Sequence, residues 1–246
     1  MLFRSSAEIW LPSARAQAPL AANPSFDTHP FKLGVASGYP TPDGVVLWTR
    51  LVTAPAEPAG GMKPERIPVQ WTVASDERFE RIVASGTAIA EPDEAHALHV
   101  GVAGLEPGRH YWYRFTAGNA ESPVGRTRTA PAAGPLAQLR FAFASCQQYE
   151  HGYYAAWAQV VRDDPDVVVF LGDYIYEASW GRNRIRQHGT PETETLDDYR
   201  ARYALYKSDP DLQAAHAALP WLLTWDDHEV RSEEHTSELQ SRLHLV

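Results

Sequence analysis

Asp173 and Tyr176 stand three residues apart, just after the apolar segment Val167–Leu171. This segment is rich in β-branched residues, which predicts a strand buried on both faces of a sheet. Gly172 ends the strand and lets the backbone pass close to another part of the chain. A carboxylate and a phenol at the carboxyl end of such a strand occupy the place where α/β sheets bind ligands and metals.

Two further predicted strands also end on side chains that can ligate a metal. One ends on Cys146, the single cysteine of the chain. The other ends on an acidic pair and a histidine, which are Asp226, Asp227 and His228. Because the carboxyl ends of parallel strands meet at one edge of a sheet, we expect all of these groups to converge in space.

Anionic groups that converge are costly to bury unless a cation compensates their charge. Taken singly, each has an ordinary structural explanation: a buried small hydrophobe for Cys146, packing for Tyr176, a helix cap for the Asp226–Asp227 pair and a satisfied polar residue for His228. Their joint occurrence at three strand ends favours a metal site. Thiolate and tyrosinate together suit trivalent iron, whereas carboxylate and carbonyl oxygens suit calcium, magnesium or manganese.

The elements that position these groups follow an all-β region. Residues 31–130 contain short apolar and aromatic segments, such as 45–51 and 110–118, separated by turn signals rich in Pro and Gly. This spacing predicts a β-sandwich of immunoglobulin or fibronectin type. Residues 129–138 are small, Pro-containing and unpatterned, which is typical of a linker.

Residues 139–230 alternate between predicted strands and helices, which indicates an α/β layered domain. Residues 152–164 have helical spacing, with Tyr153 and Trp157 expected on one face. Residues 195–220 contain two predicted helices that are interrupted at the sequence Ser-Asp-Pro. The expected fold class is therefore a β-sandwich followed by an α/β domain.

Composition limits the function classes. The chain has 246 residues, of which 44% are hydrophobic, and it contains eight tryptophans, so it is predicted to be globular. Its net charge of −9 argues against a nucleic-acid-binding surface. An anionic substrate remains compatible with this charge, since a metal dominates the field at its own site. The sequence has no apolar run long enough to span a membrane, and we expect a monomer.

Four segments occur in the order FKLGVASGYPTPDGVVLWTRL, FAFASCQ, FLGDYIYE and PWLLTWDDHEV. With these segments, residues 31–230 resemble the PhoD-like alkaline phosphatases of the metallophosphoesterase superfamily. The resemblance implies a fibronectin-like N-terminal domain at 31–130 and an α/β phosphatase domain at 139–230 that is incomplete here. It also implies hydrolysis of phosphate mono- or diesters, in which metal ions activate water and neutralise the phosphoryl oxygens.

The resemblance also assigns roles to individual residues. Cys146, Asp173 and Tyr176 would ligate Fe3+, with Asp173 bridging to Ca2+. Asp227 and His228 stand where the superfamily has an Asn-His pair that acts in metal binding and in stabilising the transition state or the leaving group.

The sequence does not decide how Asp226 and Asp227 share metal binding. His228 is the expected catalytic residue, as a donor to a phosphoryl or leaving-group oxygen.

Residues 1–30 are expected to be a leader remnant or a disordered arm. The sequence SARAQAPLAA carries the small-residue pattern of a signal cleavage site, with the mature chain beginning near Pro19. The resemblance implies a secreted or periplasmic protein, exported by the twin-arginine route.

Residues 231–246 lack the pattern of the fold. The string RSEEHTSELQS resembles the in-frame translation of a sequencing adaptor, so this stretch is expected to be a non-native tail. On this hypothesis the chain as written lacks later metal ligands, exposes apolar sheet surface and is inactive.

A second function class competes with the phosphatase. The protein could instead be a non-catalytic extracytoplasmic binding module, in which the β-sandwich is the functional domain and the phosphatase domain is degenerate. The presence of Cys146, Asp173, Tyr176 and His228 together favours the enzyme, since a degenerate site tends to lose ligands.

Overall fold

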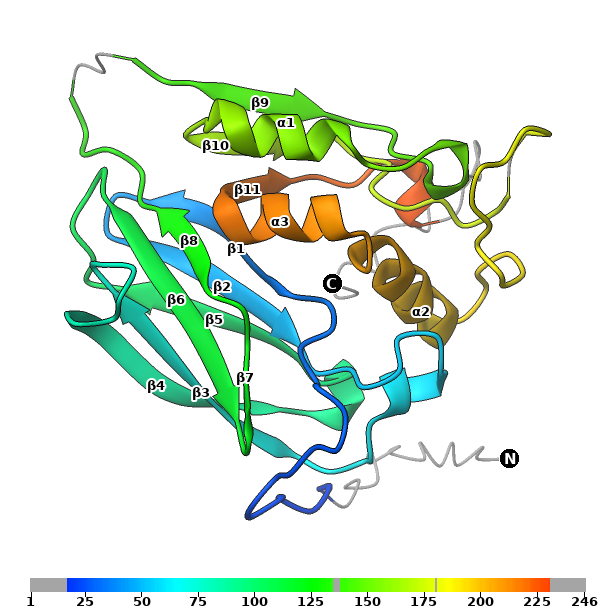
Figure 1. Ribbon diagram of the computed structural model, residues 1–246, viewed down its shortest axis with the longest axis horizontal. Coiled ribbons are helices and arrows are strands. Elements are labelled where there is room, and N and C mark those ends of the chain that lie inside the picture. The colour runs from blue at the N-terminus through cyan, green and yellow to red at the C-terminus, as the bar shows by residue number, and fades with distance from the viewer. Residues whose placement is uncertain (1–16, 135–137, 180, 231–246) are drawn as a thin grey trace, which may run out of the picture.

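The computed structural model describes residues 17–134, 138–179 and 181–230 (Figure 1). Its strands are β1 (Val35–Thr41), β2 (Gly44–Arg50), β3 (Ile67–Ala74), β4 (Ile82–Ala90), β5 (Ala97–Ala103), β6 (His110–Ala117), β7 (Ala120–Glu121), β8 (Gly125–Arg128), β9 (Phe141–Ala144), β10 (Val167–Phe170) and β11 (Pro220–Leu223). Its α-helices are α1 (Ala156–Asp163), α2 (Leu196–Lys207) and α3 (Pro210–Ala218). The 3-10 turns are η1 (Pro58–Gly61), η2 (Pro92–Glu94), η3 (Tyr149–His151) and η4 (Asp227–Glu229).

The N-terminal strands form two sheets that pack face to face, as the sequence predicts. Strands β3, β4, β6, β7 and β8 make an antiparallel sheet, and β1, β2 and β5 belong to the other sheet. Side chains such as Leu47, Val69, Val100 and Phe115 alternate inward from both sheets and form one buried cluster. Residues 31–130 therefore contain a sandwich.

One sheet runs through both predicted domains. Its order is β5-β2-β1-β11-β10-β9, and β1 pairs in parallel with β11 at Ser37–Pro220 and Gly38–Trp221. The division into 31–130 and 139–230 therefore describes the sequence pattern, but the backbone hydrogen bonding of the sheet is continuous across it. This pairing joins segments about 180 residues apart, which local patterning does not reveal.

Helices α1 and α3 cover one face of the β9–β10–β11 part of this sheet (Figure 1). Trp157 of α1 packs against Phe170 and Trp221, with ring centroids 6.2 and 4.7 Å away. Tyr153 precedes α1 and is 70% exposed, so the prediction that it shares a helix face with Trp157 is wrong. The two helices predicted within 195–220 are confirmed as α2 and α3.

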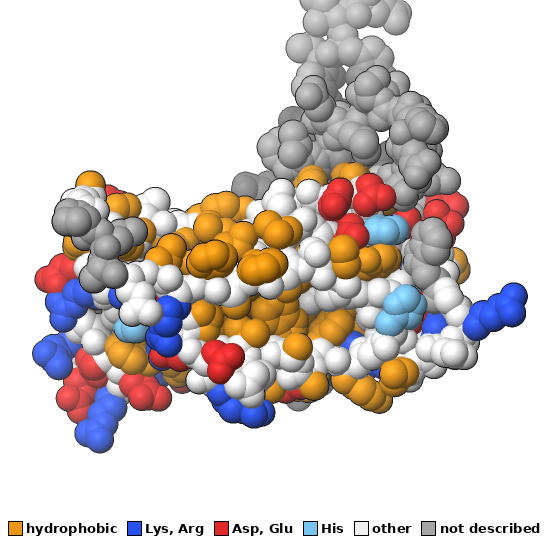
Figure 2. All heavy atoms as spheres, turned by 90° about the horizontal axis from the view of Figure 1, so that it is seen from above, with side chains coloured by type: hydrophobic (Ala, Val, Ile, Leu, Met, Phe, Trp, Pro, Cys, Tyr) orange, Lys and Arg blue, Asp and Glu red, His pale blue; other side chains and the backbone are white. Residues whose placement is uncertain are grey.

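The opposite face of β9, β10 and β11 remains apolar and accessible among the described residues. Phe141 and Phe143 are 56% and 69% exposed, and Leu222 is 37% exposed. Hydrophobic side chains gather in the middle of the face shown in Figure 2. The prediction that β10 is buried on both faces is thus wrong: Val168 and Phe170 are fully buried under the helices, whereas alternate positions are partly open.

The arm expected over residues 1–30 differs in its second half. Leu20 makes a parallel bridge with Arg66, and the backbone N–H of Phe26 donates to Asn119 Oδ1 at 2.9 Å. Residues 1–16 lie outside the described residues, as do 231–246, so the predictions about a leader and a non-native tail stay predictions. Within the described residues, no helix is both long and apolar enough to cross a membrane.

Candidate metal centre

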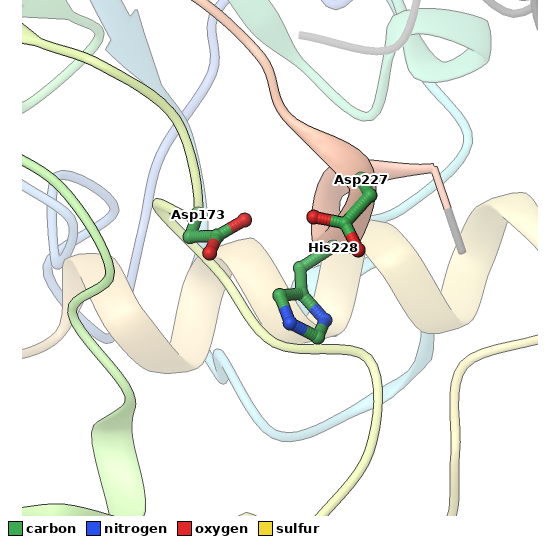
Figure 3. Close-up of side chains that lie close together, drawn as sticks. All are labelled: Asp173, Asp227 and His228. Atoms are coloured by element: carbon green, nitrogen blue, oxygen red, sulfur yellow. The ribbon is translucent and has the colours of Figure 1, made fainter. Parts of the chain in front are cut away.

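The carboxyl ends of β9, β10 and β11 bring the predicted residues together. Strand β10 pairs in parallel with both β9 and β11, so the chain leaves all three strands at the same edge. Cys146 follows β9, Asp173 follows β10, and Asp227 and His228 lie in the turn η4 after β11. Figure 3 shows the Asp173 carboxylate on one loop, across from Asp227 and His228 on the other.

Three of these residues form a compact donor set. Asp173, Asp227 and His228 each offer one ligand atom, and these atoms all lie within 4.8 Å of one another. Asp173 is buried, His228 is half-buried and Asp227 is exposed, so the set opens toward solvent on the Asp227 side. Two carboxylates and an imidazole are a mixed oxygen and nitrogen set that divalent and trivalent metals accept.

Asp173 also joins Cys146 and Tyr176 to the donor set. Cys146 Sγ lies 3.3 Å and Tyr176 Oη 3.2 Å from the same oxygen, Asp173 Oδ2. The other oxygen, Oδ1, is buried and has no hydrogen-bond partner among the described residues. A buried carboxylate oxygen without a donor is costly, and a cation bound between these groups would remove the cost. The residues present therefore fit a metal.

The electrostatic environment of Tyr176 also fits a bound metal. Burial, and then the charges of Asp173 and Cys146, raise the pKa of the Tyr176 phenol well above its ordinary value. Without a cation the phenol is held neutral. A metal ion beside it would reverse the sign of the local field and favour the tyrosinate.

Both ligand loops adopt an unusual backbone conformation. Cys146 and Asp173 each have φ of 57°, in the left-handed region that residues other than glycine rarely adopt. The two loops hold each other, because Cys146 N–H donates to Gly172 O and Gln147 N–H donates to Asp173 O, both at 3.1 Å. Strained backbone fixed by surrounding hydrogen bonds is typical of functional sites.

Glu177 positions His228 and was not identified from the sequence. The carboxylate is 3% exposed, and its Oε2 accepts a hydrogen bond from His228 Nδ1 at 2.7 Å. Burial lowers the pKa of His228, but the hydrogen bond and charge of Glu177 outweigh it, and the pKa is raised. The bond to Nδ1 fixes the orientation of the imidazole ring. The only sequence signal was an acidic residue within an apolar segment.

Glu229 holds the two loops together and was also missed. Its side chain is 2% exposed. Glu229 Oε2 accepts from the backbone N–H of Asp173 at 3.1 Å and of Asp226 at 2.8 Å, and Oε1 accepts from Tyr174 N–H. A single carboxylate therefore binds backbone donors from both the Asp173 loop and the η4 turn.

Asp226 caps η4 and lies outside the compact donor set. Its carboxylate accepts from the N–H of Asp227 at 3.0 Å. The neighbouring Gly172 has φ of +104°, and a Cβ built on it would lie 2.5 Å from Asp226 Cβ. The close approach expected at Gly172 is thus an approach to Asp226. Of the acidic pair, the geometry brings Asp227 to Asp173 and gives Asp226 a structural contact.

Comparison with known proteins covers both halves of the chain. The family model "PhoD-like phosphatase, N-terminal domain" matches residues 15–131, and the model "PhoD-like phosphatase" matches residues 141–242. Alkaline phosphatase D of Bacillus subtilis (strain 168) is 52% identical over 219 residues. That match covers 86% of this chain and 37% of the relative, so the chain spans well under half of the relative's length.

Solved structures agree with the fold. A structure described as "Structure of PhoD" matches with a TM-score of 0.83 and 52% identity, over 85% of this chain and 41% of that one. Purple acid phosphatase PPD1 from yellow lupin seeds matches with a TM-score of 0.52 at 13% identity, over 79% of this chain and 34% of that one, which concerns the fold alone. Motifs, strand-end geometry and both family models agree, and the chain belongs to the PhoD-like phosphatase family.

Proposed function

We propose that this protein is a metal-dependent phosphoric ester hydrolase of the alkaline phosphatase D type, with its metal centre built around Asp173. The observation that carries the proposal is the environment of this carboxylate. One oxygen lies next to a thiol and a phenol, and the other is buried without a partner. The identity to a relative named alkaline phosphatase D supports the reaction class.

The donor chemistry favours two different metals. Cys146, Asp173 and Tyr176 would hold Fe3+, because thiolate and tyrosinate are anionic donors that a strong Lewis acid can deprotonate. Asp173 and Asp227 would contribute to Ca2+, which prefers carboxylate oxygens. Asp226 acts mainly as the cap that places Asp227. Bound metals would supply Lewis acidity for a phosphoryl group and an activated water.

His228 is the proposed catalytic residue. Its Nδ1 is hydrogen-bonded to Glu177, which fixes the orientation of the ring and therefore the position of Nε2. A proton held at Nε2 can be donated to a phosphoryl or leaving-group oxygen. The raised pKa of His228 is in keeping with a proton donor.

The substrate is proposed to be a phosphate mono- or diester, and the protein is proposed to act outside the cytoplasm after twin-arginine export, as a monomer. The net charge of −9 is compatible with binding of an anionic substrate, because the bound metals would be the largest local charges at the site. The non-native origin proposed for residues 231–246 is tested by the nucleotide sequence of the gene beyond Val230.

Hydrolysis of p-nitrophenyl phosphate and bis(p-nitrophenyl) phosphate tests the proposed function. We expect the product of the uninterrupted gene, loaded with Fe3+ and Ca2+, to hydrolyse at least one ester, and Asp173→Asn to lower kcat/KM by about 100-fold or more. Glu94→Gln, at an exposed site, serves as the control. Chain 1–246 is expected to be inactive. Metal-loaded protein that cleaves neither ester would favour the non-catalytic binding module instead.

A further inference from the structure

A pocket of about 530 Å³ lies between strands β1 and β2, helices α2 and α3, and the segment that follows β11. Its walls are largely aromatic and include Trp48, Tyr174, Tyr203, Trp221 and Trp225. The volume falls within the range of about 300–1,000 Å³ that is typical of small-molecule sites. None of the proposed metal ligands lines it, so this pocket is separate from the metal centre.

A single lysine amine stands in this aromatic pocket. Lys207 Nζ lies 4.4 Å from the centroid of the Trp48 ring and 5.1 Å from that of Tyr174. No aspartate or glutamate lines the pocket, and no described carboxylate forms an ion pair with this amine. Lys207 is half-buried, and a partly buried cation without a counter-charge is costly because ring faces compensate only part of that cost. The pocket thus offers a positive charge that an anion would satisfy.

Two histidines also line the pocket. His99 of β5 is exposed, and desolvation followed by the charge of Lys207 lowers its pKa, whereas the buried His216 adds no charge. His216 is 4% exposed, its Nε2 lies 2.7 Å from Tyr174 Oη, and its ring stacks on Trp221 at 4.0 Å. Its Nδ1 has no hydrogen-bond partner among the described residues. Burial and then the charge of Lys207 lower the pKa of His216 well below its ordinary value, so the imidazole is neutral. Lys207 is the one lysine or arginine among the described residues that line this pocket.

We propose that this pocket binds a small monoanion with a flat apolar body, of which an aromatic carboxylate is the simplest example. The carboxylate would lie against Lys207 Nζ, and the ring would lie along the half-buried aromatic side chains of the pocket, which are Trp48, Tyr203 and Trp225. A phosphate dianion fits less well, because one cation leaves its second charge buried and uncompensated. Flat aromatic walls also favour a planar ligand that can stack on them.

The protonation state of Lys207 in the free protein supports binding of a monoanion. Burial lowers the pKa of Lys207 to about 7, so the amine is only partly protonated at neutral pH. An anion bound next to the amine favours its charged form. Binding of a carboxylate at neutral pH should therefore be accompanied by proton uptake, whereas binding of a neutral analogue should not.

Calorimetric titration of chain 1–246 with 2-naphthoate and with 2-naphthylmethanol tests the proposal. We expect naphthoate to bind more tightly than the alcohol, and Lys207→Met to weaken naphthoate binding by about 10-fold or more while leaving the alcohol unchanged. Lys63→Met removes an exposed lysine and should change neither ligand. Equal naphthoate affinity in wild type and Lys207→Met, or no binding by wild type, would overturn the proposal.

A second measurement uses the wild-type chain alone and does not depend on folding of a variant. The chain has lysines at positions 32, 63 and 207. Saturating 2-naphthoate should slow acetylation of Lys207, read by mass spectrometry, and leave acetylation of Lys32 and Lys63 unchanged. Equal protection of all three lysines, or of none, would contradict a site at Lys207.

Discussion

Glu177 fixes the orientation of His228, and its removal tests that role at the level of one side chain. The Glu177→Gln variant keeps a hydrogen-bonding group but loses the charge that faces Nδ1. Using Mn2+ as a probe of the Asp173–Asp227–His228 donor set, we expect the affinity of chain 1–246 to fall by about 10-fold. This affinity is measured from the electron paramagnetic resonance signal of free Mn2+. Unchanged affinity in Glu177→Gln, with Glu94→Gln as the control, would show that Glu177 does not act on the site.

His188 predicts an acid-sensitive fold. The ring is 5% exposed, its Nε2 lies 3.0 Å from Tyr206 Oη, and burial followed by the charge of Arg202 lowers its pKa to about 4 from 6.5. Between about pH 4 and pH 6.5, His188 therefore binds a proton in the unfolded chain but stays neutral in the folded chain. Stability from this group is present above pH 6.5 and is lost as the pH falls toward 4.

Urea unfolding at pH 7.5 and pH 5 measures this loss. We expect His188 to contribute roughly 1–2 kcal/mol of the fall in the free energy of unfolding between these pH values. The His188→Gln variant should lose correspondingly less stability over the same interval. If the variant and the wild type lose equal stability, His188 is not the group responsible.

At the residue scale, the sequence predicted which side chains converge but not the residues that support them. The convergence of Cys146, Asp173, Tyr176 and His228 was predictable, because each combines a side chain that can ligate a metal with a strand end, and their roles stay a prediction. Glu177 was not, because its role depends on a contact with a residue 51 positions away. The same reason applies to Glu229, whose side chain binds backbone groups of another loop.

At the element scale, Gly172 is the point where the loops after β10 and β11 touch. The Gly172→Ala variant should suffer both backbone strain and a clash, since its Cβ would lie 2.5 Å from Asp226 Cβ and 2.9 Å from Asp226 N. Gly104→Ala is the matched control, because Gly104 has φ of +81° with no atom within 4 Å of a built Cβ. We expect the control to cost about 1–2 kcal/mol in the free energy of unfolding, and Gly172→Ala to cost clearly more.

Urea titration of both glycine variants measures the difference. Mn2+ affinity should also fall in Gly172→Ala and stay unchanged in Gly104→Ala, because only the first change displaces the η4 turn. Equal effects of the two substitutions on both quantities would contradict the contact.

Most helices and strands can be predicted from the local sequence pattern, but the pairing of the strands cannot. Helices α2 and α3 were predictable because Ser-Asp-Pro separates them, and Asp209 caps α3 by accepting from Asp211 and Leu212 N–H. The parallel pairing of β1 with β11 was not, since nothing near Ser37 signals a partner at Pro220. The open face of β10 was missed for a related reason: a β-branched run looks alike whether one or both faces are covered.

At the scale of the whole molecule, the open apolar face predicts self-association of chain 1–246. Phe141 and Phe143 stand on one face of β9, with ring centroids 6.4 Å apart, and both are largely exposed. Apolar sheet surface of this kind associates in water. We expect Phe143→Ser to reduce concentration-dependent association in sedimentation velocity, and Val83→Ser, on the separate strand β4, to leave it unchanged. Equal association of all three proteins would contradict a role for this face.

Iron binding at Asp173 is the central claim, and visible absorption of iron-loaded chain 1–246 tests it most directly. We predict a tyrosinate-to-iron charge-transfer band that Tyr176→Phe abolishes and that Tyr153→Phe, at a 70% exposed position, leaves intact. A chain that binds no Fe3+, that binds it without a visible band, or that keeps the band in Tyr176→Phe would contradict the claim.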